Sequence, residues 1–110
     1  MVIKEEKMDK LKIFKALGNE TRLNILLWLK NPKENFEPQI HLPIMNDFQE
    51  GVCLGSIRKK ADLSQSTISG FLSVLEDAEL VETRKIGQYT YFRRNEKTIK
   101  EIAEWMKLEL

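Results

Sequence analysis

Apolar residues follow a helical period through the first thirty positions of the chain. One stripe consists of Ile3, Met8, Leu11, Phe14 and Leu17, and Gly18 can end the helix that carries it. Asn19 can cap a second helix, which Pro32 ends. The broad apolar face of that second helix consists of Leu23, Ile25, Leu26, Leu27, Trp28 and Leu29. The pattern therefore predicts two helices in succession.

The helical period returns in residues 54–75. Ile57 and Ala61 suit a short helix, and Asp62-Leu63-Ser64 then makes a turn in which Ser64 can cap a longer helix. The core-facing stripe of the longer helix, spaced i, i+3, i+4 and i+7, consists of Ile68, Phe71, Leu72 and Leu75. This arrangement predicts a helix-turn-helix unit.

A strand-like pattern begins at residue 80. Residues 80–85 and 89–93 are predicted to be two strands, joined by Ile86-Gly87-Gln88, in which Gly87 supplies a positive φ. A closing amphipathic helix carries Ile99, Ile102, Ala103, Trp105, Met106 and Leu108. The whole pattern predicts a mainly α fold with a β-hairpin wing, a winged helix-turn-helix.

The outer face of the helix after Ser64 is small and polar, with hardly any long charged side chains. Its candidate DNA contacts are Ser64, Gln65, Ser66, Thr67 and Ser69. A helix in the DNA major groove needs such side chains, because they reach base edges without clashing. Candidate phosphate contacts are Arg84, Lys85 and Arg93 on the hairpin and Lys59 and Lys60 on the preceding helix. The alternative is an ordinary solvated helix beside an ordinary exposed hairpin.

Length and charge agree with this interpretation without proving it. A chain of 110 residues has room for one domain with a modest core, so we expect a single domain over 1–110 that oligomerisation helps to stabilise. The net charge is only +1, but residues 56–94 carry seven basic and five acidic side chains, and residues 31–55 carry one and four. The candidate DNA-binding region is therefore locally positive.

The scarcity of cysteine and histidine limits the chemistry. With one cysteine, Cys53, and one histidine, His41, the chain can form no intrachain disulfide and has too few soft ligands for a zinc site. Nothing orients His41 as a base toward Cys53, so we expect no enzymatic activity and no cofactor. There is no signal peptide and no apolar run of membrane length, which predicts a cytoplasmic protein with no membrane contact.

Several segments together resemble the ArsR/SmtB family of dimeric bacterial repressors. They are residues 14–29 (FKALGNETRLNILLWL), 52–57 (VCLGSI), 63–92 and the closing helix, about four-fifths of the chain. The segment LSQSTIS, followed by LxxLxxAxLV and an aromatic wing, is rather specific, and helix-turn-helix families in general do not share the opening LGNETRLNIL. The resemblance implies a homodimer packed through its first and last helices. It also implies that the dimer binds double-stranded DNA at an inverted-repeat operator and releases it when an inducer arrives.

The chain departs from the family pattern at three places. Gly70 stands where relatives usually carry a basic or histidine side chain, and Glu79 replaces a common glycine at the end of that helix. The CVCDL box of the metal-sensing members reads Cys53-Leu54-Gly55-Ser56-Ile57 here, and the closing helix offers Glu101 and Glu104 but no histidine. A metal site of the family type cannot be assembled from these residues, so we expect a non-metal inducer.

The resemblance does not explain residues 31–51, a segment rich in apolar residues that ends just before Cys53. This segment could cover an effector pocket for a small molecule, or it could widen the dimer contact. Two interpretations of Cys53 also stay open. It is either an inert small hydrophobe, or a redox sensor at a helix N-terminus that favours the reactive thiolate.

The first and last helices carry apolar residues that one small domain would not bury alone. The predicted dimer contacts are Phe14, Leu17, Ile99, Ile102 and Trp105, and tryptophan is a frequent interface anchor. We therefore predict a homodimeric, DNA-binding transcriptional repressor. The alternative is a winged-helix protein-interaction module that no longer reads DNA, which the near-neutral net charge and Gly70 would permit.

Overall fold

The computed structural model describes residues 8–40 and 47–110, so Ile3 and His41 lie outside the described residues. The elements in chain order are α1 (Lys10–Leu17), α2 (Glu20–Lys30), α3 (Pro32–Asn35), β1 (Val52–Cys53), α4 (Leu54–Ala61), α5 (Gln65–Asp77), β2 (Val81–Ile86), β3 (Tyr89–Arg94) and α6 (Glu96–Glu109). The strands form one antiparallel sheet in the order β1-β3-β2. The predicted winged helix-turn-helix fold is confirmed.

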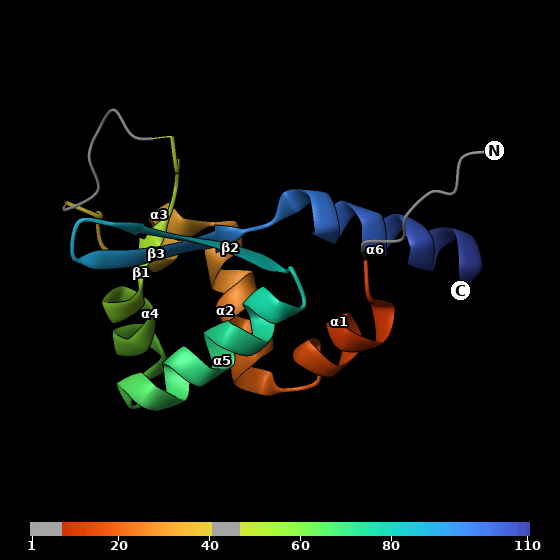
Figure 1. Cartoon of the computed structure of the whole chain (residues 1–110), viewed down its shortest axis with the longest axis horizontal. Coiled ribbons are helices and arrows are strands. Elements are labelled where there is room, and N and C mark those ends of the chain that lie inside the picture. The colour runs from red at the N-terminus through yellow and green to blue at the C-terminus, as the bar shows by residue number, and fades with distance from the viewer. Residues whose placement is uncertain (1–7, 41–46) are drawn as a thin grey trace.

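The sheet separates the helix-turn-helix from the segment that precedes β1. Figure 1 shows α4 and α5 on one side of the sheet and the chain leading to β1 on the other, with α1 and α6 together at one end of the molecule. One hydrophobic core joins these parts, with buried residues from α1, α2, α4, α5, α6 and the sheet. The core thereby fixes the position of α5 relative to the hairpin.

The two N-terminal helices form where the sequence predicts them, but their buried faces differ from the prediction. In α1 the buried residues are Ile13 and Ala16, whereas Leu11 is 71% exposed and Phe14 is 38% exposed. In α2, Ile25, Leu26 and Leu29 are buried, while Leu23 and Leu27 are exposed. The sequence pattern favours burial of the whole broad face of α2, and for Leu23 and Leu27 this expectation is wrong. Periodicity identifies an apolar face, and it cannot tell a core from a surface that another chain could cover.

Local capping chemistry explains the junction of α1 and α2. The Asn19 side chain accepts a hydrogen bond from the Arg22 backbone N–H at 3.0 Å. The Arg22 guanidinium donates through Nε to the Ala16 carbonyl at 2.7 Å and through Nη2 to the Lys15 carbonyl at 3.0 Å. These carbonyls lie at the end of α1, where the Lys15 carbonyl also accepts from the Gly18 backbone N–H at 3.2 Å. Arg22 therefore adds donors to both carbonyls and ties the end of α1 to the start of α2.

The helix-turn-helix unit agrees with the sequence prediction. Asp62 ends α4 in the left-handed conformation with φ +56°, and Ser64 caps α5 by accepting from the Thr67 N–H at 3.2 Å. Ile68, Leu72 and Leu75 are buried and Phe71 is partly buried, as their spacing predicts. The polar face of α5 is consequently turned away from the core.

The hairpin also forms as predicted, with a shift at the turn. Ile86 pairs with Tyr89 and belongs to β2, so the turn consists of Gly87 and Gln88 alone. Gly87 has φ +63° and Glu79, at the end of α5, has φ +60°. The glycine takes this conformation at little cost, whereas the glutamate takes it against its preference.

The segment after α2 contains structure that the sequence pattern does not predict. Pro32–Asn35 form the short helix α3, and Val52 and Cys53 form β1 by pairing with Phe92 and Tyr91 of β3. Phe48 is 1% exposed, and a Cβ added at Gly51 would lie 2.6 Å from the Phe48 ring. Residues 48–53 of this segment are therefore packed against the sheet.

Candidate nucleic-acid interface

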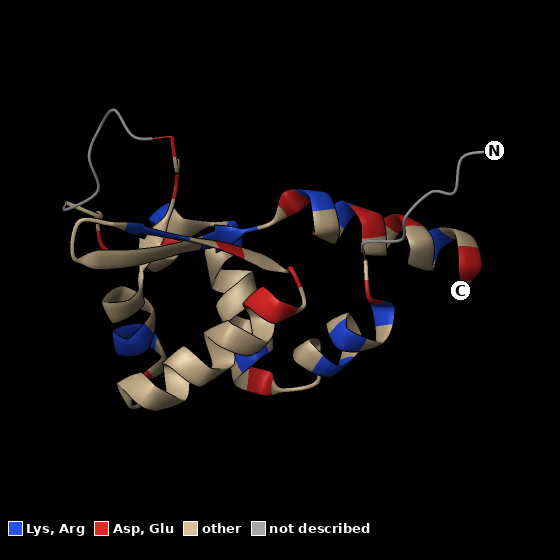
Figure 2. Cartoon of the chain, viewed as in Figure 1, with Lys and Arg blue, Asp and Glu red and all other residues tan. Residues whose placement is uncertain are grey.

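The N-terminal turn of α5 presents a group of short polar side chains to solvent. Gln65, Ser66 and Thr67 are exposed, and Ser69 is half-buried. The Ser64 hydroxyl donates to the Thr67 hydroxyl at 2.9 Å and lies 3.3 Å from the Ser66 hydroxyl. Ser64 is thus engaged as the helix cap, which leaves Gln65 as the longest polar side chain at this end. Figure 2 shows that α5 carries no basic residue and becomes acidic only at its C-terminal end.

The basic residues of α4 surround the turn that leads into α5. Lys59 Nζ lies 3.4 Å from Glu37 Oε1, with both side chains largely exposed. Lys60 Nζ lies 5.4 Å from the Trp28 ring centroid. Arg58, which was not among the predicted contacts, is also exposed and donates a long hydrogen bond of 3.4 Å to the Leu63 carbonyl. Its signal in the sequence is its place in the run of three basic residues before the turn.

The two faces of the hairpin carry different predicted contacts. Side chains of paired residues share a face, and successive pairs alternate between faces. Lys85 pairs with Thr90, and both line a hollow of about 420 Å³ beside Ser69 and Ser73 of α5. Arg84 pairs with Tyr91 and Arg93 with Glu82, on the face turned away from α5. By the strand pairing, Lys85 is therefore the predicted hairpin contact whose side chain lies on the side of α5, while Arg84, its neighbour in β2, also lines part of this hollow.

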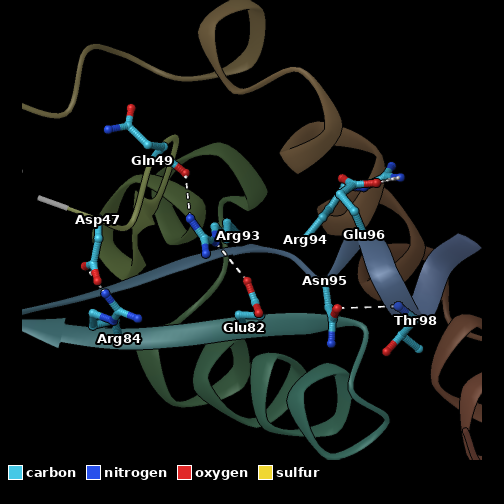
Figure 3. A network of polar contacts seen from close by, with 9 residues as sticks. All are labelled: Asp47, Gln49, Glu82, Arg84, Arg93, Arg94, Asn95, Glu96 and Thr98. Atoms are coloured by element: carbon cyan, nitrogen blue, oxygen red, sulfur yellow. Dashed lines mark hydrogen bonds and ion pairs between the residues drawn. The ribbon is translucent and has the colours of Figure 1, made fainter.

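Arg84 and Arg93 are held by the chain's own residues on that outer face (Figure 3). Arg84 forms an ion pair with Asp47. Arg93 donates to Glu82 Oε1 at 2.8 Å and to the Gln49 carbonyl at 3.3 Å. Between them lies Phe48, whose ring centroid is 5.1 Å from the Arg84 guanidinium carbon and 4.2 Å from that of Arg93. The sequence prediction of two free phosphate contacts here misses these intrachain partners.

Cys53 is the N-cap residue of α4, which agrees with its predicted position at a helix N-terminus. It is half-buried, its Sγ lies 3.3 Å from the Ser56 hydroxyl, and its backbone N–H donates to Gln39 Oε1 at 2.9 Å. Across the strand pair, the Tyr91 hydroxyl is buried and has no hydrogen-bond partner among residues 8–40 and 47–110. Burial raises the pKa of Tyr91 above its ordinary value, and the neighbouring Cys53 and Tyr89 raise it further.

A cavity of about 450 Å³ lies beside Cys53, between the segment that contains α3 and the segment that leads into β1. The first segment contributes Phe36, Pro38 and Gln39, and the second contributes Gln49–Val52. Gln39 joins the cavity wall to Cys53 through the hydrogen bond to its backbone. Among residues 8–40 and 47–110, no cluster of histidine, cysteine and carboxylate side chains could hold a metal ion.

The predicted dimer contacts divide into exposed and core residues. Phe14 is partly exposed, and its ring centroid lies 6.4 Å from that of Trp105, over which Lys10 Nζ lies at 5.1 Å. Leu17 and Ile99 pack partly against the core, and Ile102 is only 5% exposed. Ile102 therefore belongs to the core of its own chain. Leu11 and Leu108, both mostly exposed, extend the apolar surface around Phe14 and Trp105 along α1 and α6.

No helix in the described part of the chain combines the length and hydrophobicity needed to cross a membrane. No family model matches the chain. The chain is 42% identical over 103 residues to the HTH-type transcriptional regulator YbzH of Bacillus subtilis strain 168, and the matched region covers 94% of this chain and 100% of YbzH. The chain is also 26% identical over 94 residues to the transcriptional repressor SdpR of the same organism. That match covers 86% of this chain and 84% of SdpR.

The fold is similar to that of several solved structures. The ArsR family transcriptional regulator RHA00566 has a TM-score of 0.68 and 17% identity, over 91% of this chain and 84% of that one. The homodimeric winged helix-turn-helix DNA-binding domain of Mb0332 from Mycobacterium bovis has a TM-score of 0.62 and 24% identity, over 90% of this chain and 76% of that one. At such identities the likeness carries the fold alone.

Proposed function

Since the chain belongs to the HTH-type transcriptional regulators of the ArsR family, we propose that it is a homodimeric repressor that binds an inverted-repeat operator through α5. The observation that carries this proposal is the exposed polar face of α5, which is clear of long charged side chains while its apolar face is fixed in the core. Gln65 and Ser66 would contact base edges, and the α5 N-terminus and Thr67 would contact phosphate. Such a protein would act in the cytoplasm, beside the DNA.

The basic residues around α5 support a phosphate-binding rim. Lys59 and Lys60 on α4 and Lys85 on the hairpin lie to either side of α5 and are exposed. Arg58, which is exposed on α4 but was not among the predicted contacts, also belongs to this rim. Phosphate contacts of this kind fix the register of the protein on DNA and carry no sequence information. They would offset the nearly neutral net charge by concentrating positive charge around α5.

The test of the proposal is an operator-binding measurement with Gln65 and Ser66 both replaced by Ala. The DNA upstream of the chain's own coding region is the first duplex to examine for a protected inverted repeat. We expect the double variant to lose roughly 1–3 kcal/mol per lost base contact while the fold and the dimer stay intact. Glu34→Ala, at an exposed position of α3, is a control outside both α5 and the proposed dimer contact. An unchanged footprint in the double variant would exclude α5 from the groove.

The dimer and the single domain belong to the same proposal. The core that joins α1 to α6 supports one domain over the described residues. The exposed apolar surface of α1 and α6, centred on Phe14 and Trp105, supports a two-fold contact between copies of this chain. A symmetric dimer would present two α5 helices to two half-sites, which is why an inverted repeat is expected.

The inducer site that we propose is the cavity beside Cys53. Its lining supports a small molecule, since it combines apolar side chains with the amides of Gln39 and Gln49. A redox signal at Cys53 is the second candidate, because its half-buried thiol lies at the start of α4, next to the helix-turn-helix. Treatment with mild peroxide distinguishes the small-molecule inducer from the redox signal. It should lower the operator affinity of the wild type and leave Cys53→Ser unchanged if the thiol is the sensor.

The alternative function, a protein-interaction module, is favoured by the intrachain partners of Arg84 and Arg93. The salt dependence of duplex binding distinguishes the two functions. A DNA-binding regulator must lose affinity steeply as salt rises, because each phosphate contact releases counterions. An interaction module would show no measurable duplex binding even at low salt.

A further inference from the structure

We propose that residues Asp47–Gly51 form a latch over the outer face of the wing and compete with DNA phosphate for Arg84 and Arg93. The proposal rests on the proposed function, since it names how the wing of a DNA-binding repressor is controlled. Its basis is the set of contacts in Figure 3, in which a segment far from the hairpin in sequence provides partners for both hairpin arginines.

The chemistry of the latch matches that of a DNA backbone. Asp47 places a carboxylate on Arg84, and the Gln49 carbonyl accepts from Arg93. A guanidinium binds carboxylate and phosphate through the same donors, so an anion at Arg84 occupies the position that a phosphate oxygen would take. The Asp47 side chain is 86% exposed. An exposed ion pair contributes little to stability, so phosphate can displace it.

Phe48 anchors the latch between the two arginines. Its ring is 1% exposed and lies against both guanidinium groups, at 5.1 Å and 4.2 Å. These cation–π contacts hold both guanidinium groups beside the ring, whereas a phosphate contact would require at least one of them to extend outward. The same ring therefore keeps the latch in place and limits the reach of both side chains.

The sequence builds a tight turn that aims Phe48 at the arginines. The Gly51 N–H donates to the Phe48 carbonyl at 3.3 Å, and Glu50 has φ +65°. A Cβ at residue 51 would lie 2.6 Å and 2.9 Å from two carbons of the Phe48 ring and 3.2 Å from the Tyr91 Cβ. Only glycine leaves room for this approach. The geometry of the turn is thus specified by Gly51 as well as by the ion pair.

The latch also shares residues with the cavity beside Cys53. Gln49, Glu50 and Gly51 line that cavity, and Gln49 and Glu50 also line a hollow of about 370 Å³ on the Arg93 side. A molecule in the cavity would contact the turn that carries Phe48. If the bound molecule favours the closed turn, both arginines are withheld from phosphate and the affinity for DNA falls. An inducer must lower the affinity of a repressor for DNA in this way.

Duplex binding by four proteins tests the latch: the wild type, Asp47→Asn, Arg84→Ala and the double variant. One added phosphate contact steepens the slope of log affinity against log salt by about 0.9. We therefore expect the affinity ratio of Asp47→Asn to wild type to be about three-fold larger at 50 mM salt than at 200 mM salt. Arg84→Ala should reduce affinity strongly in the Asp47→Asn background and only weakly in the wild type.

Two further proteins control the interpretation. Asp77→Asn removes the same charge from an exposed ion pair with Lys12, on α5 and α1 away from the wing, and should leave the salt slope unchanged. Phe48→Leu keeps an apolar side chain but removes the ring between the arginines, and it should change binding in the same direction as Asp47→Asn. Circular dichroism confirms that each variant is folded.

The outcomes are distinguishable. If Asp47→Asn improves binding equally with and without Arg84, the effect is general electrostatics and the latch is overturned. If Asp47→Asn weakens binding, the segment supports the wing and does not compete with DNA, which also overturns it. If the wild type binds duplex DNA and Asp47→Asn binds no better, the latch fails while the proposed function stands. If none of the proteins binds duplex DNA at 50 mM salt, the proposed function fails and competition fails with it.

Discussion

At the scale of single residues, Gly70 is placed where neither the backbone nor the packing requires glycine. It lies in the interior of α5, it is exposed, and a Cβ added there would meet nothing within 4 Å. Gly87 is the opposite case, because its φ of +63° forms the hairpin turn. The two glycines look alike in the sequence, and only the backbone conformation distinguishes them.

We expect Gly70→Ala to raise the free energy of unfolding by about 1 kcal/mol, because alanine loses less backbone entropy in a helix interior. Gly87→Ala should lower it by about 1 kcal/mol, because a Cβ disfavours positive φ. Urea denaturation followed by circular dichroism measures both. A loss of stability in Gly70→Ala would show that α5 needs flexibility at this position.

The buried hydroxyl of Tyr91 makes a second residue-scale prediction. It has no hydrogen-bond partner in the part of the chain that the structure describes, and burial raises the Tyr91 pKa above its ordinary value of about 10. Tyr91→Phe should therefore raise the free energy of unfolding at pH 7 by about 1 kcal/mol, since it removes an unsatisfied buried group. Tyr89→Phe, at a half-buried position of the same strand, is the control for loss of a hydroxyl.

The same pKa shift sets the pH dependence. A group with a raised folded-state pKa contributes fully below the unfolded-state value, and its contribution is lost as pH rises through the folded-state value. The wild type should therefore lose stability above about pH 10, and Tyr91→Phe should lose less over the same interval. Urea denaturation at pH 7 and above pH 10 checks this. Parallel losses in the two proteins would contradict it.

At the scale of elements, the predictable parts are those whose signals lie close together in the chain. The caps at Asn19 and Ser64, the buried stripe of α5 and the Gly87 turn each depend on residues within a few positions of one another. β1 could not be predicted in this way, because Val52 and Cys53 become a strand only by pairing with β3. The intrachain partners of Arg84 and Arg93 were missed for the same reason.

The junction of α1 and α2 gives the element-scale prediction. Arg22 binds two carbonyls at the end of α1 and lies 5.6 Å from the Phe71 ring of α5, so it connects three helices. Arg22→Lys keeps the charge but loses the fork of donors, and it should lower the free energy of unfolding by roughly 1–3 kcal/mol. Arg58→Lys, with one long hydrogen bond at an exposed site, should change it little. Thermal and urea denaturation measure the loss of stability in the two variants. Equal losses would show that the hydrogen bonds of Arg22 to the end of α1 do not stabilise the helix junction.

At the scale of the whole molecule, the two ends of the protein would serve different purposes. The helix-turn-helix and wing lie at one end, while α1 and α6 lie at the other with an apolar surface around Phe14 and Trp105 (Figure 1). A contact between two copies through α1 and α6 would leave both α5 helices free. Two-fold dimers of this type read half-sites about 34 Å apart, one turn of DNA.

The last prediction tests that arrangement with Phe14→Glu. Phe14 is exposed enough for a monomer to tolerate glutamate, but a two-fold contact would bury the new charge without a partner, which costs several kcal/mol. We expect a folded monomer by sedimentation equilibrium, with a large loss of affinity for a full inverted repeat and a small loss for a single half-site. Leu27→Glu, at an exposed leucine on α2, is the matched control and should remain dimeric. A Phe14→Glu protein that still sediments as a dimer would place the contact between copies on another face, and the expected half-site spacing would change with it.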